Sequence, residues 1–243
     1  MFQIVICSAG RVEILKRQTM AILQYTEMPI TIIVPYEEAA VYEAAFPGRN
    51  IIGVQKGLVK QRAFARSLFP PEAHILFMDD DISRIKVLEY TVMLVPIWEA
   101  FDDVVESLFE EMEKKGCTMW GVYPMCNRGW MKATDVRDTA YIVGAFYGIL
   151  NSIPNEAGDD EAEDFRRQLR LLRSGGHCIR FNWVGVQTKY WKGDVGGIQR
   201  TPATSLKVFQ ELAEEYSQYV KMSQTRKGRP NLRFHRHITG QSE

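Results

Sequence analysis

The chain has 243 residues, which is enough for one sizeable hydrophobic core. Apolar residues make up 46% of the sequence and charged residues 25%, as in ordinary globular proteins, and the formal net charge is zero. The overall charge therefore gives no sign of a nucleic-acid or membrane partner. Because no apolar stretch approaches the roughly 20 residues that span a bilayer, we expect a soluble, cytoplasmic protein.

The first third of the sequence alternates between apolar strands and helices. Continuous, partly β-branched runs predict buried strands at residues 2–7, 30–34, 51–54 and 74–78. Apolar residues at helical spacing predict helices between these strands, at residues 12–25, 37–46 and 59–68. Buried strands separated by helices are typical of a doubly wound, mostly parallel sheet. We therefore predict an α/β fold in a single domain, with ligands outside the carboxyl ends of the strands.

The rest of the chain is less regular. Its patterns predict helices at residues 97–115, 163–172 and 206–219. They predict further strands at residues 118–123, 140–150 and 178–186. A final stretch without acidic residues, 221–237, is expected to be a basic tail.

Three consecutive carboxylates, Asp79, Asp80 and Asp81, follow the fourth predicted strand. Like charges this close repel one another unless a cation neutralises them. Oxygen ligands suit Mg²⁺ or Mn²⁺, and on an extended backbone Asp79 and Asp81 point to the same side. A polar turn or helix cap is the alternative, but a cap needs only one carboxylate. The sequence therefore predicts a divalent metal site here.

The segment ILFMDDDI, residues 75–82, resembles the Asp-x-Asp motif of the GT-A glycosyltransferases, which follows the fourth strand of a Rossmann-like nucleotide-binding half. The resemblance implies that Asp79 or Asp80 contacts the nucleotide and that Asp81, with Asp79, binds the metal. It also implies a nucleotide-binding half at residues 1–81 and an acceptor-binding half at 82–243. Five further residues would then lie near the nucleotide: Ser8, Arg11, Gln61, Arg62 and Arg66.

A second acidic patch, residues 159–164, precedes the predicted helix RRQLRLL. GT-A enzymes carry an acidic motif at this point, whose carboxylate deprotonates the acceptor hydroxyl. By this resemblance Asp164 is the general base, with Glu163 as the alternative, and a base beside the anomeric carbon gives inversion. Negative charge at a helix N-terminus is stabilising by itself, which leaves a purely structural interpretation open.

Two histidines, His235 and His237, lie near the C-terminus. Many GT-A enzymes take a third metal ligand from a histidine in this region, so the resemblance implies that one of the two binds the metal. Neutral imidazole is a competent ligand. The alternative is a pair of surface histidines in a basic tail.

Basic and aromatic residues gather in the last quarter of the chain. The cations of the expected tail are Lys221, Arg226, Lys227, Arg229, Arg233 and Arg236. Trp183, Tyr190 and Trp191 precede them, together with a glycine-rich segment. Cations and aromatic rings around such a segment suit a phosphate-bearing polymer, and a solvated tail beside core aromatics is the alternative.

The pattern GGHCIRFNWVGVQTKYWKGDVGGIQ, residues 175–199, is similar to the TET-associated glycosyltransferases of bacteriophages. That resemblance implies a UDP-sugar donor, a 5-hydroxymethylpyrimidine in phage DNA as acceptor, and a host cytoplasm as location. The zero net charge counts against a DNA partner, because an excess of Lys and Arg is expected of one.

Two alternatives remain for the function. A glycosyltransferase of this kind could act on a saccharide or lipid instead of DNA. Asp79, Asp81 and Ser83 also loosely match the nucleophile motif of haloacid-dehalogenase-type phosphohydrolases. That nucleophile usually follows the first strand, however, and three strand–helix units precede this one.

Overall fold

The computed structural model describes residues 1–89, 93–154, 158, 160–188, 202–226 and 228–236. Most strands belong to one ten-stranded sheet in the order β3-β2-β1-β4-β9-β7-β10-β5-β6, and β8 pairs with β10 beside this path. Its strands are β1 (Gln3–Cys7), β2 (Ile30–Pro35), β3 (Asn50–Val54), β4 (His74–Asp79), β5 (Arg84–Glu89), β6 (Met93–Pro96), β7 (Met119–Tyr123), β8 (Asp135–Arg137), β9 (Phe146–Leu150) and β10 (Cys178–Gln187). The first four strands are mutually parallel, and β9 is antiparallel to both of its neighbours.

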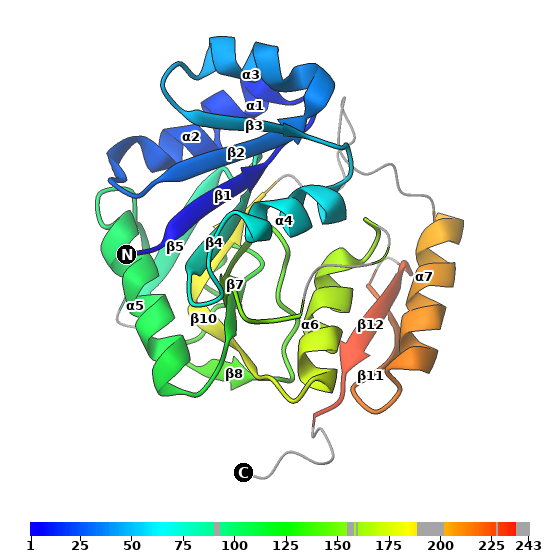
Figure 1. Cartoon of the computed structure of the whole chain (residues 1–243). Coiled ribbons are helices and arrows are strands. Elements are labelled where there is room, and N and C mark those ends of the chain that lie inside the picture. The colour runs from blue at the N-terminus through cyan, green and yellow to red at the C-terminus, as the bar shows by residue number, and fades with distance from the viewer. Residues whose placement is uncertain (90–92, 155–157, 159, 189–201, 227, 237–243) are drawn as a thin grey trace.

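Helices cover both faces of this sheet (Figure 1). They are α1 (Val12–Arg17), α2 (Thr19–Ile22), η1 (Leu23–Tyr25), η2 (Tyr36–Glu38), α3 (Ala39–Ala45), α4 (Leu58–Ser67), α5 (Phe101–Lys114), α6 (Glu163–Arg173) and α7 (Pro202–Glu215). Among the described residues, no helix is long and apolar enough to cross a membrane. The predicted α/β fold with a mostly parallel sheet is confirmed.

Two apolar clusters hold the layers together, one on each face of the sheet. Along β1, Ile4 and Ile6 belong to the cluster under α1, α2, α3 and α5, whereas Val5 and Cys7 belong to the cluster under α4 and α6. Successive side chains of a strand point to opposite faces. Strands that are apolar on both faces therefore need helices on both, and this explains the continuous apolar runs of the first strands.

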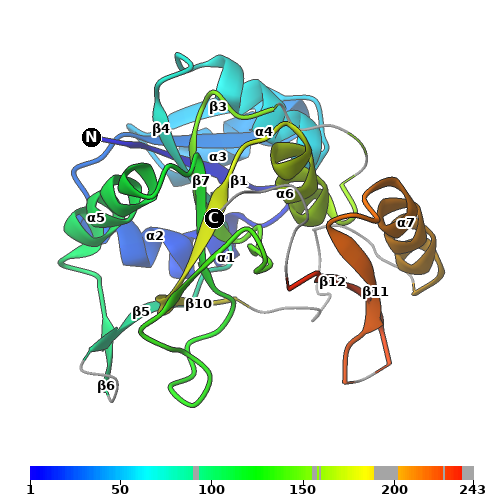
Figure 2. The ribbon, with the colours of Figure 1, turned by 90° about the horizontal axis from the view of Figure 1, so that it is seen from below.

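A smaller unit flanks the main sheet on one side. It consists of α7 and an antiparallel hairpin, β11 (Val220–Gln224) and β12 (Pro230–Phe234), which stand together beside α6 (Figures 1 and 2). Leu212 of α7 and Leu232 and Phe234 of β12 join the same apolar cluster as α6. The segment expected as a basic tail is thus largely a β-hairpin, anchored by alternate apolar residues.

Several predicted boundaries differ from the structure. The helix expected at 12–25 is broken at Gln18, whose ψ of −87° is not helical, and α5 begins at Phe101 instead of 97. The strand expected at 140–150 is only β9, because residues 141–145 form the approach to it. Strands β5, β6 and β8 were not predicted, since β5 and β8 lack a continuous apolar run and the apolar run of β6 is only four residues long.

Candidate functional site

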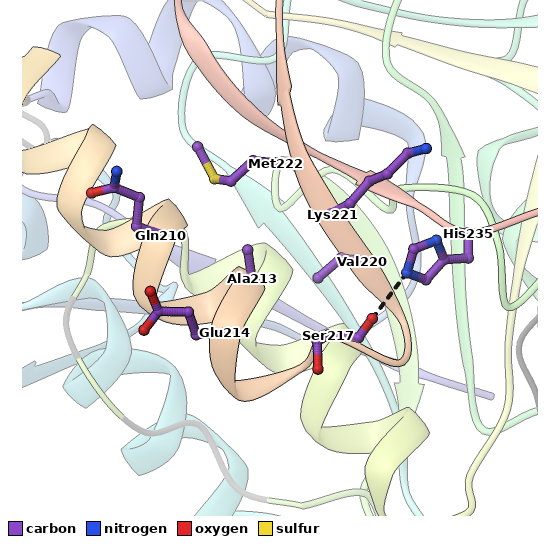
Figure 3. A pocket seen from close by; sticks show the side chains of 8 residues that line it. All are labelled: Gln210, Ala213, Glu214, Ser217, Val220, Lys221, Met222 and His235. Carbon is purple, nitrogen blue, oxygen red and sulfur yellow. Dashed lines mark hydrogen bonds between the residues drawn. The ribbon is translucent and has the colours of Figure 1, made fainter.

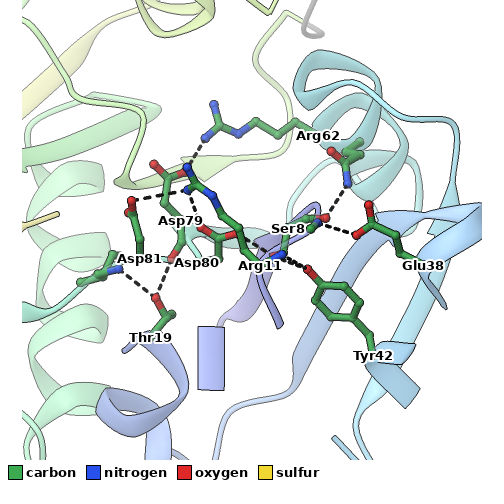
Figure 4. Close-up of polar contacts among 12 residues, drawn as sticks. Ser8, Arg11, Thr19, Glu38, Tyr42, Arg62, Asp79, Asp80 and Asp81 are labelled. Carbon is green, nitrogen blue, oxygen red and sulfur yellow. Dashed lines mark hydrogen bonds and ion pairs between the residues drawn. The ribbon is translucent and has the colours of Figure 1, made fainter. Parts of the chain in front are cut away.

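The three aspartates lie at the carboxyl edge of the sheet, where the sequence predicted them. Asp79 ends β4 and pairs with Cys7, the last residue of β1, so the turn after β1 lies beside it. The backbone N–H of Asp79 donates to Ala145 O (2.9 Å), which brings the start of β9 to the same point. Figure 4 shows the polar side chains that meet here.

Asp80 is the buried member of the cluster. Its carboxylate accepts a hydrogen bond from Ser8 Oγ (2.6 Å) and pairs with Arg11 Nη1 (3.1 Å). Ser8 also bonds to the hydroxyl of Tyr42 (2.7 Å), which accepts from the backbone N–H of Arg11. Asp80 and Ser8 are each less than 5% exposed. Their side chains therefore hold the turn after β1 against the end of β4 and are not open to a nucleotide in this arrangement.

Thr19 holds the backbone of the three aspartates in place through two hydrogen bonds. Its completely buried hydroxyl donates to Asp79 O (2.7 Å) and accepts from the N–H of Ile82 (3.1 Å), so one side chain spans the triplet. The helix break at Gln18 lies immediately before it. Thr19 was not predicted as a site residue, because a threonine within an apolar helix pattern has no distinguishing signal.

Asp79 and Asp81 are the carboxylates that face outward. The Asp79 side chain is 37% exposed and that of Asp81 15% exposed. Arg62 Nη2 contacts Asp79 Oδ1 at 3.2 Å, and Arg11 Nη1 lies 3.5 Å from Asp81 Oδ2. Surrounding protein atoms raise the pKa of Asp79 to about 7, the nearby carboxylates of Asp81 and Asp80 add to this, and Arg62 opposes it. Burial and the neighbouring carboxylates thus outweigh the ion pair with Arg62 in setting the pKa of Asp79.

Glu163, the first residue of α6, is buried between two arginines. Arg62 Nη1 lies 2.5 Å from its Oε1 and Arg167 Nη1 lies 2.7 Å from its Oε2. Burial raises the pKa of Glu163, but the two guanidinium groups outweigh it, and the net pKa lies below the usual range. A carboxylate held in two ion pairs is a poor proton acceptor. Glu163 thus positions Arg62, and its two ion pairs do not suit the alternative role of base.

The described acids of the second patch other than Glu163 have different hydrogen-bond partners. Asp160 caps α4 by accepting the N–H of Val59 (2.8 Å), and Glu161 accepts from the Ser205 hydroxyl. Asp164 accepts from the hydroxyl of Tyr141 and from the N–H of Phe165 (2.9 Å), and it is only partly buried. Asp159 lies outside the described residues.

Gly144 lies between the aspartates at the end of β4 and the acids at the start of α6. Its carbonyl accepts from Arg62 Nη2 (2.8 Å), the same nitrogen that contacts Asp79. A Cβ at this position would lie 2.6 Å from Glu163 Oε1 and 3.4 Å from the Cβ of Asp164. The close approach of the end of β4, the start of β9 and the start of α6 therefore requires glycine here.

Two predicted nucleotide ligands have other bonds. Gln61 donates to the carbonyls of Ser8 (3.3 Å) and Ile33 (3.0 Å), which ties the ends of β1 and β2 together. Arg66 donates to Asn151 and to the carbonyls of Ile153 and Pro154. Asn151 follows Leu150, which pairs with His74 at the amino end of β4, opposite Asp79. Arg66 was predicted to lie near the nucleotide, but these bonds are at the end of β4 opposite the aspartates.

His235 is not beside the aspartates. Its Nε2 contacts Ser217 O at 2.9 Å, and with Lys221 and Met222 it lines a surface hollow of about 430 Å³ between α7 and β11 (Figure 3). Within the described part of the chain, no group of three or more His, Cys, Asp or Glu side chains is arranged to hold a metal ion. The structure therefore gives His235 a role in the hairpin unit, and His237 lies outside the described residues.

The predicted acceptor residues are divided. Lys221, Arg226, Arg229, Arg233 and Arg236 are exposed on the hairpin and at its ends, whereas Lys227 lies outside the described residues. Trp183 packs against Phe181 at the edge of the core (ring centroids 6.0 Å) and hydrogen-bonds to Asp135. Its indole is thus part of the fold, and Tyr190 and Trp191 lie outside the described residues.

The chain is similar to known proteins in its fold and in its sequence. A solved structure of GalNAc-T7 with UDP, GalNAc and Mn²⁺ matches with a TM-score of 0.53 at 12% identity, over 90% of this chain and 50% of that one. The chain thus spans about half the length of that relative, and the likeness shows the fold. Bifunctional IspDF from Campylobacter jejuni matches at a TM-score of 0.43 and 9% identity, over 74% of this chain and 48% of that one.

No curated protein matches the sequence. The model of one family, TET-Associated Glycosyltransferase, matches residues 2–197, which include every element of the main sheet and end before α7 and the hairpin. The match confirms the resemblance in the sequence and sets aside the phosphohydrolase alternative. The chain belongs to the TET-associated glycosyltransferase family.

Proposed function

We propose that this protein transfers a sugar, most simply a hexose, from a UDP-sugar to a hydroxymethyl group of a pyrimidine in DNA, with inversion at the anomeric carbon. The observation that carries the proposal is the outward-facing pair Asp79 and Asp81 at the carboxyl edge of a GT-A-like sheet, within a glycosyltransferase family. Ligands of such sheets bind at this edge.

The carboxylates fit a divalent cation. Asp79 and Asp81 offer oxygen ligands, and they belong to a cluster of three adjacent acids with which Arg11 and Arg62 form ion pairs. Mg²⁺ and Mn²⁺ commonly take one or two protein carboxylates and complete their shell with water and substrate phosphates. Two ligands therefore suffice without a histidine. A bound cation would neutralise charge on the diphosphate leaving group.

The transfer itself needs a base. The acceptor oxygen attacks the anomeric carbon, its proton passes to the carboxylate of Asp164, and UDP leaves with the electrons of the broken glycosidic bond. Tyr141 and the N-terminus of α6 hold Asp164 in place. Arg62 lies between the metal side and the base side, since it contacts both Asp79 and Glu163.

The exposed cations of the hairpin support a DNA acceptor. Residues 220–236 include no acid, and each phosphate contact adds about −0.9 to the slope of log K against log salt. Substituting Lys221, Arg229 and Arg233 together is expected to flatten that slope by up to ~3 while leaving UDP binding intact. Although the net charge of the chain is zero, the hairpin thus offers a local positive surface to DNA.

The first experiment measures thermal stability with UDP and Mn²⁺, alone and together. Ligand at 100 times its Kd stabilises a protein by about 2.7 kcal/mol, which corresponds to roughly 5–11 °C for a chain of this size. Asp81→Ala should remove the joint shift, whereas Asp103→Ala, an exposed acid of α5, should keep it. An unchanged shift in Asp81→Ala would refute the metal assignment.

The second experiment incubates the protein with UDP-sugars, Mn²⁺ and DNA that contains 5-hydroxymethylcytosine or 5-hydroxymethyluracil. Mass spectrometry of the nucleosides should show the addition of one sugar. Transfer to a saccharide or lipid but not to this DNA would refute the acceptor and leave the glycosyltransferase proposal standing.

A further inference from the structure

The loop after β7 presents an exposed tryptophan. Trp130 is 51% exposed, although an indole usually loses most of its surface on folding. The loop, residues 124–134, carries Arg128 and Lys132, both exposed, and no acid. β7 and β4 run in the same direction, because both are antiparallel to β9. The loop therefore leaves the sheet at the edge that carries the aspartates.

This loop is anchored on both sides of the indole. Cys126 Sγ contacts Gly185 O (3.2 Å), and Met131 is 4% exposed and packs against Gly185 of β10. Asn127 closes the turn between them, because its carbonyl accepts from the N–H of Trp130 (3.0 Å) and its side chain accepts from Gly129. A ring displayed on an anchored turn loses little conformational freedom when it binds a flat partner.

The hairpin reaches this tryptophan from the C-terminal end of the chain. The guanidinium carbon of Arg226, at the turn between β11 and β12, lies 5.4 Å from the centre of a Trp130 ring. Backbone bonds from Thr225 to Arg229 O and from Gly228 to Thr225 O, both 2.9 Å, close the turn. Two segments far apart in the sequence thus join a cation to an exposed ring.

The charges on the hairpin are arranged for an anion. The strand register places Lys221 directly opposite Arg233, and like charges in that position repel. Within the described part of the chain, neither side chain forms an ion pair with an acid. Such repulsion is offset when phosphates lie against the surface.

We propose that Trp130 stacks on a nucleobase of the acceptor strand while Arg226, Lys221 and Arg233 contact its phosphates. The inference rests on the proposed DNA acceptor and names the surface that binds it. An aromatic ring stacks on any base, whereas the cations require a charged backbone, so a neutral saccharide fits the ring but not its surroundings. A positioned strand then presents its hydroxymethyl group at the carboxyl edge.

The test compares two oligonucleotides of equal length, one bearing 5-hydroxymethylcytosine and one built of abasic nucleotides. Stacking on Trp130 contributes to binding of the base-bearing strand and not to binding of the abasic strand. Trp130→Leu should weaken binding of the base-bearing strand by about 5- to 150-fold and leave binding of the abasic strand unchanged, as measured by fluorescence anisotropy. Trp130→Phe should recover most of the loss. Arg226→Gln should weaken both strands and flatten the salt dependence.

A matched control is Trp98→Leu, because Trp98 is 44% exposed but precedes Glu99 and the acidic first turn of α5. It should bind both strands like the wild type. Equal weakening of both strands by Trp130→Leu would show that the ring only tethers the hairpin, and no weakening would also overturn the inference. In either case continued transfer to DNA would leave the proposed function intact. Failure of the wild type to bind any DNA would refute both the stacking role of Trp130 and the proposed DNA acceptor.

Discussion

Replacement of Glu163 by glutamine is the most direct test of how the site is held. The change removes the carboxylate that pairs with both Arg62 and Arg167, whose side chains are at most 2% exposed. Breaking a buried ion pair by removing one partner costs about 3–5 kcal/mol, because the other charge stays buried. A protein of this size has a total stability of roughly 5–15 kcal/mol. The variant should therefore lose about 6–20 °C in its midpoint of thermal unfolding.

Urea unfolding gives the free energy directly and is the measurement to make. The matched control is Glu215→Gln, which breaks a half-exposed pair with Arg173 (2.8 Å), and it should cost no more than ~1 kcal/mol. A loss below about 1 kcal/mol in Glu163→Gln would refute the structural role. Normal stability with kcat reduced by several orders of magnitude would return Glu163 to the role of base.

Two further predictions follow from the same carboxylates. Asp164→Asn should leave the thermal shift with UDP and Mn²⁺ nearly unchanged while lowering kcat by about 10²–10⁴, and equal loss of UDP affinity would contradict the assignment. The second concerns pH. The folded pKa of Glu163 lies below its unfolded value of 4.5, so its stabilisation is present above pH 4.5 and is lost as the pH falls through the folded pKa. The free energy of unfolding, measured by urea titration at several pH values below 4.5, should therefore fall less steeply with decreasing pH in Glu163→Gln than in the wild type.

The aspartate cluster could be predicted because its signal is local. Three acids directly after a buried strand identify both the chemistry and the end of the strand, and the parallel order of the first strands fixes the edge on which they lie. The partners of the cluster had no such signal. Tyr42 and Thr19 occupy apolar faces of helices, and a tyrosine or threonine in such a face looks the same whether it packs or supports a site.

The hairpin was missed for a different reason. Residues 220–224 and 230–234 mix cations with single apolar residues, so the alternation that anchors Leu232 and Phe234 is short and easily read as a solvated tail. Its strand pairing brings Arg226 to Trp130, a contact between distant segments that periodicity cannot show. The sequence instead indicated Trp183, Tyr190 and Trp191, which lie close together along the chain.

Arg62 and Arg66 are one turn apart on α4 but have different partners. They lie on the same face of α4, and the sequence placed both near the nucleotide. The helix runs away from the carboxyl edge, so a step of about 5.4 Å separates a side chain that contacts Asp79 and Glu163 from one that bonds to residues 151–154.

The two arginines should therefore respond differently to the same substitution. Lysine keeps the charge but loses the planar fork, so in Arg62→Lys one ammonium cannot hold Asp79, Gly144 O and Glu163 together. A displacement of about 1 Å between the metal side and the base side can lower kcat about 10²-fold. The bonds described for Arg66 lie at the opposite end of β4, so Arg66→Lys should reduce stability while kcat per folded molecule stays unchanged. Steady-state kinetics beside urea unfolding separates the two. Equal loss of kcat in both variants would contradict the division of roles, because Arg62 contacts Asp79 and Glu163 whereas the described bonds of Arg66 lie at the opposite end of β4.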